Sequence, residues 1–167
     1  DSKVIASISS KLQKTDSFIT VAAQAANFKA WTSETPNLYT ANVVLLNAAG
    51  KKIYELNEKF GFRTIEIRYG MGVYINGTQV KFKGTNRHCF WPETARALSD
   101  EQQLNDALLL KEMNMNAVRC SHYPPDEYFL KLCDSLGIYV LDELAGWQAS
   151  IANGPDRYTN RHSTQQE

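Results

Sequence analysis

The sequence predicts a mixed fold in which antiparallel β-structure precedes alternating parallel β/α units. Before residue 70, short segments alternate apolar and polar residues with a period of two, which is typical of strands with one packed face. After residue 84, two segments with helical periodicity separate three short apolar strands. Such alternation is typical of parallel strands joined by crossover helices.

The composition excludes several classes of protein. The chain has 167 residues, 18 basic against 18 acidic side chains, and no apolar run long enough for a membrane-spanning helix. Because the Lys and Arg residues are scattered, no basic block is available for nucleic acid or an anionic membrane. An aromatic content of 11% supports a packed core. We therefore expect a folded protein that has neither nucleic acid nor a membrane as its partner.

The cysteines and the first ten residues are the features that relate to the cellular compartment of the protein. Three cysteines are an odd number, so we expect at least one free thiol rather than a disulfide-stapled domain. The first ten residues lack the basic start and apolar stretch of a signal peptide. The beginning of the chain is then mature, cytoplasmic or internal to a longer protein, and both the bacterial periplasm and the cytoplasm stay open.

The antiparallel part is expected to contain four strands, at residues 18–22, 39–46, 52–56 and 64–68. Turn signals at residues 35–37 and 47–50 separate three of them. Because an immunoglobulin-like sandwich has seven strands, this part is expected to be incomplete. A hairpin follows at residues 73–82, with Asn76-Gly77 where a type I′ turn needs two residues of positive φ.

Two helices are expected in the second part. Ser99 and Gln102 form a capping box at the start of the first, whose apolar positions are Leu104, Ala107, Leu108 and Leu110. The second begins near Pro124 and ends at Gly137, and its apolar positions are Phe129, Leu132, Cys133 and Leu136. Residues 116–119 are expected to be a short buried strand, and residues 138–141 a strand buried on both faces.

Polar side chains follow each expected parallel strand at its carboxyl end. This edge of a parallel sheet is where ligands bind. The side chains are Asn86, Arg87 and His88 after the first strand, Arg119 and His122 after the second, and Asp142 and Glu143 after the third, with Trp91 and Trp147 nearby. The loops at the opposite edge are short, and this asymmetry predicts a binding site.

Each of these residues also has a structural interpretation. Arg119 could form a buried ion pair with Asp142 or Glu143 instead of contacting a ligand. The two histidines could be core residues, and the tryptophans could pack at the rim. A metal site at Cys120 and His122, with His88 or Cys89, lacks a tight ligand spacing, so no metal is expected. A nucleophilic pair of Cys120 and His122 is disfavoured because side chains two apart on a strand are poorly placed for a hydrogen bond.

Several segments resemble one known family. They occur in order between Trp31 and Trp147, at residues 31–39 (WTSETPNLY), 60–63 (FGFR), 75–77 (ING), 83–88 (KGTNRH), 116–124 (NAVRCSHYP), 132–134 (LCD) and 139–143 (YVLDE). They are similar to glycoside hydrolase family 2, which includes bacterial β-galactosidases and β-glucuronidases. The resemblance implies that residues 1–69 are the C-terminal portion of an immunoglobulin-like β-sandwich. Residues 70–167 would then be the N-terminal portion of a TIM (β/α)₈ barrel.

The resemblance implies hydrolysis of a terminal β-linked sugar with retention, by two glutamates. In the family the acid/base glutamate follows an Asn after the fourth barrel strand, and the nucleophile follows the seventh. Neither segment is found, and Asn57-Glu58 lies in the sandwich part. A complete barrel takes about 250 residues. We therefore expect a fragment of a longer enzyme, inactive alone, whose substrate is a glycoside and whose full-length form can be a homo-oligomer.

The resemblance also assigns roles to the rim residues. Arg119 and His122 match positions that line the sugar pocket, Asn86, Arg87 and His88 match its first-strand wall, and Asp142 and Glu143 match acids that support the catalytic carboxylates. The chain departs from the family's β-galactosidases at Cys89-Phe90-Trp91 and at residues 144–147, where those enzymes carry acidic, histidine and magnesium-binding residues. No cofactor is therefore expected, and galactose specificity is not implied. The competing interpretation is a non-catalytic carbohydrate-binding or structural module.

Overall fold

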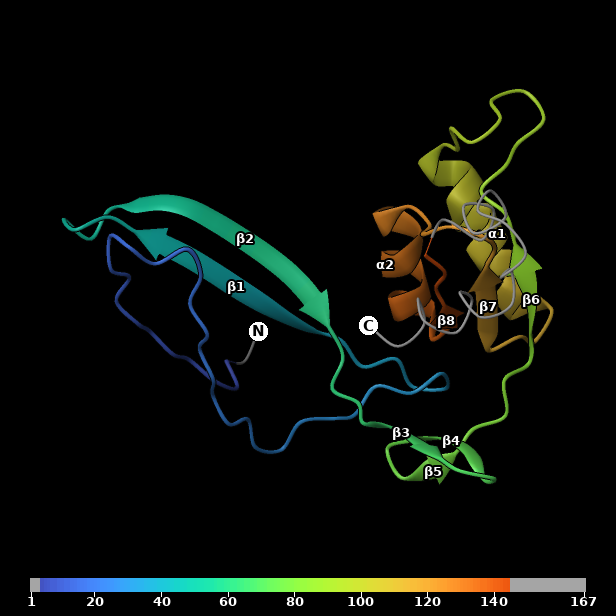
Figure 1. Cartoon of the computed structure of the whole chain (residues 1–167), viewed down its shortest axis with the longest axis horizontal. Helices are drawn as coiled ribbons and strands as arrows, with labels where there is room; N and C mark the ends of the chain where they lie inside the picture. Colours follow the sequence, from blue (N-terminus) through green and yellow to red (C-terminus); the bar gives the residue numbers. More distant parts are fainter. Residues whose placement is uncertain (1–3, 145–167) are drawn as a thin grey trace, which may run out of the picture.

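The computed structural model describes residues 4–144, which form three separate β-sheets and two helices (Figure 1). The elements are β1 (Tyr39–Leu46), β2 (Lys52–Phe60), β3 (Ile65–Arg68), β4 (Gly72–Ile75), β5 (Thr78–Gln79), β6 (Gly84–Arg87), α1 (Asp100–Glu112), β7 (Ala117–Cys120), α2 (Glu127–Leu136) and β8 (Tyr139–Leu141). Among the described residues, no helix has the length and apolar character needed to cross a membrane.

The first sheet is a long hairpin of β1 and β2, which extends away from the α/β part in Figure 1. The strands pair antiparallel from Tyr39 opposite Phe60 to Leu46 opposite Lys52. The strand expected at residues 52–56 is therefore real and four residues longer. The prediction of a strand at residues 18–22 was wrong. The segment has no regular structure, and Phe18 is 83% exposed. Alternating residues make a strand only when another strand is available for pairing, and β1 and β2 pair solely with each other in the described chain.

The second sheet has the order β3-β4-β5, and all its pairs are antiparallel. Asn76 and Gly77 have φ values of 51° and 77°, so the predicted type I′ turn residues are confirmed. The strand after the turn is shorter than expected and covers only Thr78–Gln79. Because β3 pairs with β4, the segment at residues 65–68 shares a sheet with the following hairpin and not with β1 and β2.

The third sheet is parallel, with the order β6-β7-β8, and α1 and α2 are the connections between its strands. The predicted β, α, β, α, β order is confirmed, and so is the capping box of Ser99 and Gln102. The core lies between this sheet and the helices: Ala107, Leu110, Val118, Cys120, Phe129, Cys133 and Ile138. Leu108 was wrongly expected in the core; it is 46% exposed, whereas Gln103 is buried on the inner face of α1.

Gly137 ends α2 in the left-handed conformation, with a φ of 73°. A Cβ atom at this position would lie 2.2 Å from the carbonyl oxygen of Ser33, so the segment before β1 packs directly on the end of α2. The following β8 was expected to be buried on both faces, and this was wrong. Leu141 is 60% exposed because the helices cover the opposite face of the sheet, whereas on its own face Trp31 and Phe82 pack against Tyr139 and leave the carboxyl end open.

Candidate functional site at the carboxyl edge of the parallel sheet

Glu143 joins two side chains that come from the end of the neighbouring strand β7. Its Oε1 accepts a hydrogen bond from Nε of Arg119 at 2.5 Å and forms an ion pair with Nη2 at the same distance. Its Oε2 lies 3.2 Å from Nδ1 of His122. A third strand contributes Asn86, whose Oδ1 accepts from Nη1 of Arg119 at 3.3 Å. Three neighbouring strands thus place four of the expected residues in one hydrogen-bonded cluster.

The strand register explains why these residues meet. Asn86 of β6, Arg119 of β7 and Leu141 of β8 are paired in the parallel ladder, so their side chains project from the same face. Glu143 and His122 follow two and three residues after those positions, where the strands end. Arg119 pairs with Glu143, as one structural interpretation expected, but the pair is not deeply buried: the side chains of Arg119 and Glu143 are 37% and 24% exposed.

His88 lies next to His122. The centres of the two imidazole rings are 5.4 Å apart, and the rings meet edge to face. Tyr123 stands beside His88 at 6.4 Å. Tyr123 was not singled out from the sequence, although it follows His122 directly. Its hydroxyl donates to the carbonyl of Cys89 at 3.4 Å, and the guanidinium of Arg96 stacks on its ring at 3.7 Å. These contacts fasten the loop after β6 to the loop after β7.

Arg87 lies on the other face of the sheet. It is 9% exposed, its Nε donates to Oδ2 of Asp106 in α1 at 2.8 Å, and its guanidinium stacks on Phe129 of α2 at 3.8 Å. Its Nη1 also reaches Sγ of Cys89 at 3.2 Å. Adjacent residues of a strand point to opposite faces, so Asn86 and Arg87 cannot both face the rim. Arg87 therefore connects the sheet to its helices, and the alternation within β6 was the signal that could have indicated this.

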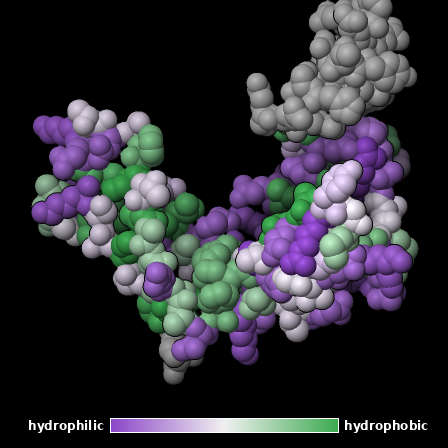
Figure 2. Space-filling view, turned by 60° about the horizontal axis from the view of Figure 1, so that its bottom comes forward, coloured by the Kyte–Doolittle hydropathy of each residue, from purple (hydrophilic) through white to green (hydrophobic). Residues whose placement is uncertain are grey.

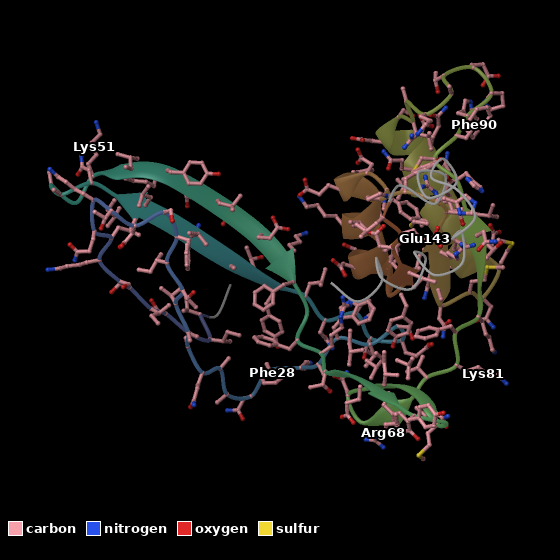
Figure 3. The ribbon with its side chains drawn as sticks, in the orientation of Figure 1. Phe28, Lys51, Arg68, Lys81, Phe90 and Glu143 are labelled. Atoms are coloured by element: carbon pink, nitrogen blue, oxygen red, sulfur yellow. The ribbon has the colours of Figure 1, made fainter. Side chains whose placement is uncertain are left out.

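The remaining expected residues lie at the edge of the cluster or outside the described chain. Asp142 accepts the backbone N–H of Glu143 at 2.8 Å through Oδ1. Trp91 is 40% exposed and pairs with Ala95 through two backbone hydrogen bonds in the loop after β6. Figure 3 shows Phe90 in this loop and Glu143 lower down, beside the sheet. Trp147 lies outside the described residues.

A groove of about 940 Å³ runs along the open sheet face next to the cluster. Its lining combines the sheet, from Asn86 and Arg119 to Tyr139, with Ile65 and Val73 of the second sheet. Most of the groove lining is apolar, and its charged side chains are Arg119 at the carboxyl ends of the strands and the pair of Arg63 and Asp134 at α2. Figure 2 shows the described surface with hydrophobic areas between hydrophilic ones.

Two of the three cysteines are buried, one at the end of β7 and one in α2. Burial raises the pKa of the Cys120 thiol to about 11 and that of Cys133 to about 12. A thiol with such a pKa carries almost no thiolate near neutral pH, which argues against a nucleophilic role for Cys120. Among residues 4–144, no group of three or more His, Cys, Asp or Glu side chains is arranged to hold a metal ion. The cluster of Asn86, Arg119, His122 and Glu143 can donate and accept hydrogen bonds. The carboxylate of Glu143 neutralises the charge of Arg119 within it.

Comparisons with known proteins match this arrangement to one family. The model "Glycosyl hydrolases family 2" matches residues 2–63, and "Glycosyl hydrolases family 2, TIM barrel domain" matches residues 65–166. A β-galactosidase of Lactobacillus delbrueckii subsp. bulgaricus is 43% identical over 114 residues, which are 68% of this chain and 11% of that protein. A β-galactosidase of Priestia megaterium is 46% identical over 114 residues, again 68% of this chain and 11% of the relative.

Solved structures give the same result. A Bacteroides uniformis β-glucuronidase is 35% identical with a TM-score of 0.68, over 74% of this chain and 15% of that one. A Bifidobacterium dentium β-glucuronidase, complexed with coumarin-3-O-glucuronide, is 35% identical with a TM-score of 0.65, over 70% of this chain and 19% of that one. The chain therefore spans about a tenth of the length of the curated relatives it matches.

Proposed function

The chain belongs to glycosyl hydrolases family 2, and from this premise we propose that it is part of an enzyme that removes a terminal β-linked sugar with retention. In this proposal residues 1–69 are the end of an immunoglobulin-like sandwich and residues 70–167 begin the catalytic (β/α)₈ barrel. The parallel order β6-β7-β8 with α1 and α2 as crossovers supports the barrel assignment.

The cluster of Asn86, Arg119, His122 and Glu143 is the observation that carries the proposal. It lies at the carboxyl ends of three parallel strands, the edge at which TIM-barrel enzymes bind their substrates. Its side chains offer N–H donors and oxygen acceptors at partly exposed positions, which suits the hydroxyl groups of a sugar ring. Asp142, His88 and Trp91 are proposed to border the same pocket.

Retaining hydrolysis needs two carboxyl groups about 5 Å apart, one to protonate the leaving oxygen and one to attack the anomeric carbon. In the cluster, Glu143 is already engaged by Arg119 and His122 through both of its oxygens. We therefore assign these residues to binding and orienting the terminal sugar. The acid/base and nucleophilic glutamates are proposed to follow later barrel strands of a longer protein, and no cofactor is proposed.

The proposal is tested by expressing the reading frame extended beyond residue 167. This protein is expected to hydrolyse nitrophenyl β-galactoside or nitrophenyl β-glucuronide, and ¹H NMR of the first product is expected to show the β-anomer. The 167-residue chain is the matched control and is expected to be inactive on both. Sugar binding by the short chain with no turnover by the extended protein would instead support a carbohydrate-binding module.

A further inference from the structure

We propose that Glu143 is a positioning residue that fixes which nitrogen of His122 carries the hydrogen. The carboxylate holds this hydrogen on Nδ1 and so makes Nε2 an acceptor for the O–H group of a sugar hydroxyl. The part about the sugar rests on the proposed function, whereas the part about His122 concerns only the described residues.

The first step concerns the protonation of Glu143. A guanidinium has five N–H donors and no acceptor, so Oε1 of Glu143 must accept from Arg119. An ion pair with Arg119 requires the carboxylate form, and both oxygens of a carboxylate can only accept. Oε2 therefore cannot supply a hydrogen to the contact of 3.2 Å with His122. The shared hydrogen must lie on Nδ1 of the imidazole.

The second step concerns the other ring nitrogen. In a neutral imidazole only one nitrogen carries a hydrogen, so placing it on Nδ1 leaves a lone pair on Nε2. The carboxylate thus decides the direction of any hydrogen bond at Nε2. Arg119, held by Glu143 on one side and Asn86 on the other, stays a donor. At the end of β7, Nε2 of His122 is then an acceptor and Arg119 a donor, and the carboxylate of Glu143 orients both side chains.

A purely structural ion pair makes a different prediction for Glu143→Gln. The amide keeps the shape of the side chain but has one acceptor oxygen and one donor nitrogen. Because Arg119 only donates, it selects the amide oxygen and leaves the NH₂ group facing Nδ1 of His122. The NH₂ group donates to a bare Nδ1, so the hydrogen of His122 must move to Nε2. The variant is therefore expected to reverse the tautomer without removing a contact.

The experiment is ¹⁵N magic-angle-spinning NMR on the sedimented, ¹⁵N-histidine-labelled 167-residue chain, at about pH 8, where an ordinary imidazole is neutral. Sedimented samples tolerate association of the chain. The signals of His122 are assigned by their loss in His122→Ala. The matched control is Asp106→Asn, which alters the ion pair of Arg87 at the end of β6 and is expected to leave His122 unchanged.

Wild-type His122 is expected to carry its hydrogen on Nδ1, and the Glu143→Gln variant on Nε2. An Nε2–H tautomer, a mixture or an imidazolium in the wild type would overturn the proposal, even if the variant does not fold. So would an Nδ1–H tautomer in a folded Glu143→Gln chain.

The extended enzyme tests the part of the proposal that concerns the sugar. There, Glu143→Gln is expected to lower kcat/KM. An unchanged kcat/KM together with a reversed tautomer would overturn the role of His122 in binding the sugar hydroxyl. A reversed tautomer with an inactive wild-type extended protein would refute only the proposed function.

Discussion

The indole Nε1–H of Trp31 donates a 2.7 Å hydrogen bond to the backbone carbonyl of Asp134 in α2, 103 residues later in the chain. Trp31 is completely buried, and Tyr139 of β8 meets its ring edge-on at 5.3 Å. Nδ2 of Asn76, in the turn after β4, donates to the carbonyl of Trp31 at 3.0 Å. Trp31 thus connects the segment before β1 to both of the later sheets, through its indole on one side and its backbone carbonyl on the other.

Trp31 is therefore expected to be a main source of stability. Trp31→Phe keeps most of the ring but leaves the Asp134 carbonyl without its donor, and it should lower the free energy of unfolding by about 1 kcal/mol. Trp31→Ala also creates a cavity and should cost about 3–5 kcal/mol. Urea unfolding followed by far-ultraviolet circular dichroism measures both, with Phe18→Ala at an exposed position as the control. An unchanged stability of Trp31→Phe would contradict the role of the hydrogen bond, and equal losses for both Trp31 variants would contradict the role of ring packing.

Arg87 and Arg119 form a matched pair for separating a core role from a site role. Arg87→Ala leaves Asp106 without its partner and removes the packing on Phe129, and the side chain is only 7% exposed. Because a large buried side chain is truncated, its cost in unfolding free energy is expected to be about 2–5 kcal/mol. Arg119→Ala breaks a partly exposed pair and should cost about 1 kcal/mol or less.

Urea unfolding of the two variants measures both losses in unfolding free energy. If Arg119→Ala destabilises the chain as much as Arg87→Ala does, Arg119 is a structural residue and the pocket assignment loses its main donor.

Thiol reactivity tests the packing of the α/β part. Burial raises the pKa of Cys120 to about 11 and of Cys133 to about 12, so at pH 8 at most about one Cys120 thiol in a thousand is ionised. Cys89 is only partly buried. Iodoacetamide is expected to modify Cys89 alone in the native chain and all three thiols in urea, as mass spectrometry would show. Labelling of Cys133 in the native chain at the rate seen in urea would contradict this packing.

The open face of the parallel sheet predicts self-association of the isolated chain. Leu141 is 60% exposed and Ile67 is 83% exposed, and both line the groove beside the sheet. Within the described residues, β8 is an edge strand. Sedimentation velocity is expected to show association that rises with concentration and weakens in Leu141→Lys. A monomer at all concentrations that melts cooperatively would refute the prediction.

Local signals explain the parts of the fold that the sequence predicted correctly. The capping box at Ser99 and the Asn76-Gly77 turn depend on residues within one turn of chain, and both are present. The strand expected at residues 18–22 failed because pairing depends on what lies beside a strand, which alternation does not encode. The apolar helix faces were only partly predicted, since Phe129 is fully buried whereas Leu108 faces outward.

The site was predicted in outline but not in detail. The carboxyl ends of parallel strands converge, so the meeting of Asn86, Arg119, His122 and Glu143 could be expected from the strand order. Which acid pairs with Arg119 depends on the exact end of β8 and could not be read from adjacent acids. The hydrogen bond from Trp31 to Asp134 has no local signal, because 103 residues separate its partners.

The central claim is that His122 binds the terminal sugar at the carboxyl edge of the sheet. It is tested most directly by kcat/KM of His122→Ala in the extended enzyme, with the melting temperature measured on the same samples. A hydrogen bond that strengthens as charge develops on the sugar acts on the transition state more than on folding, so kcat/KM should fall by about a hundredfold or more. The melting temperature is expected to change little. Unchanged kinetics, or activity lost only because the variant unfolds, would contradict the assignment and leave His122 a packing residue.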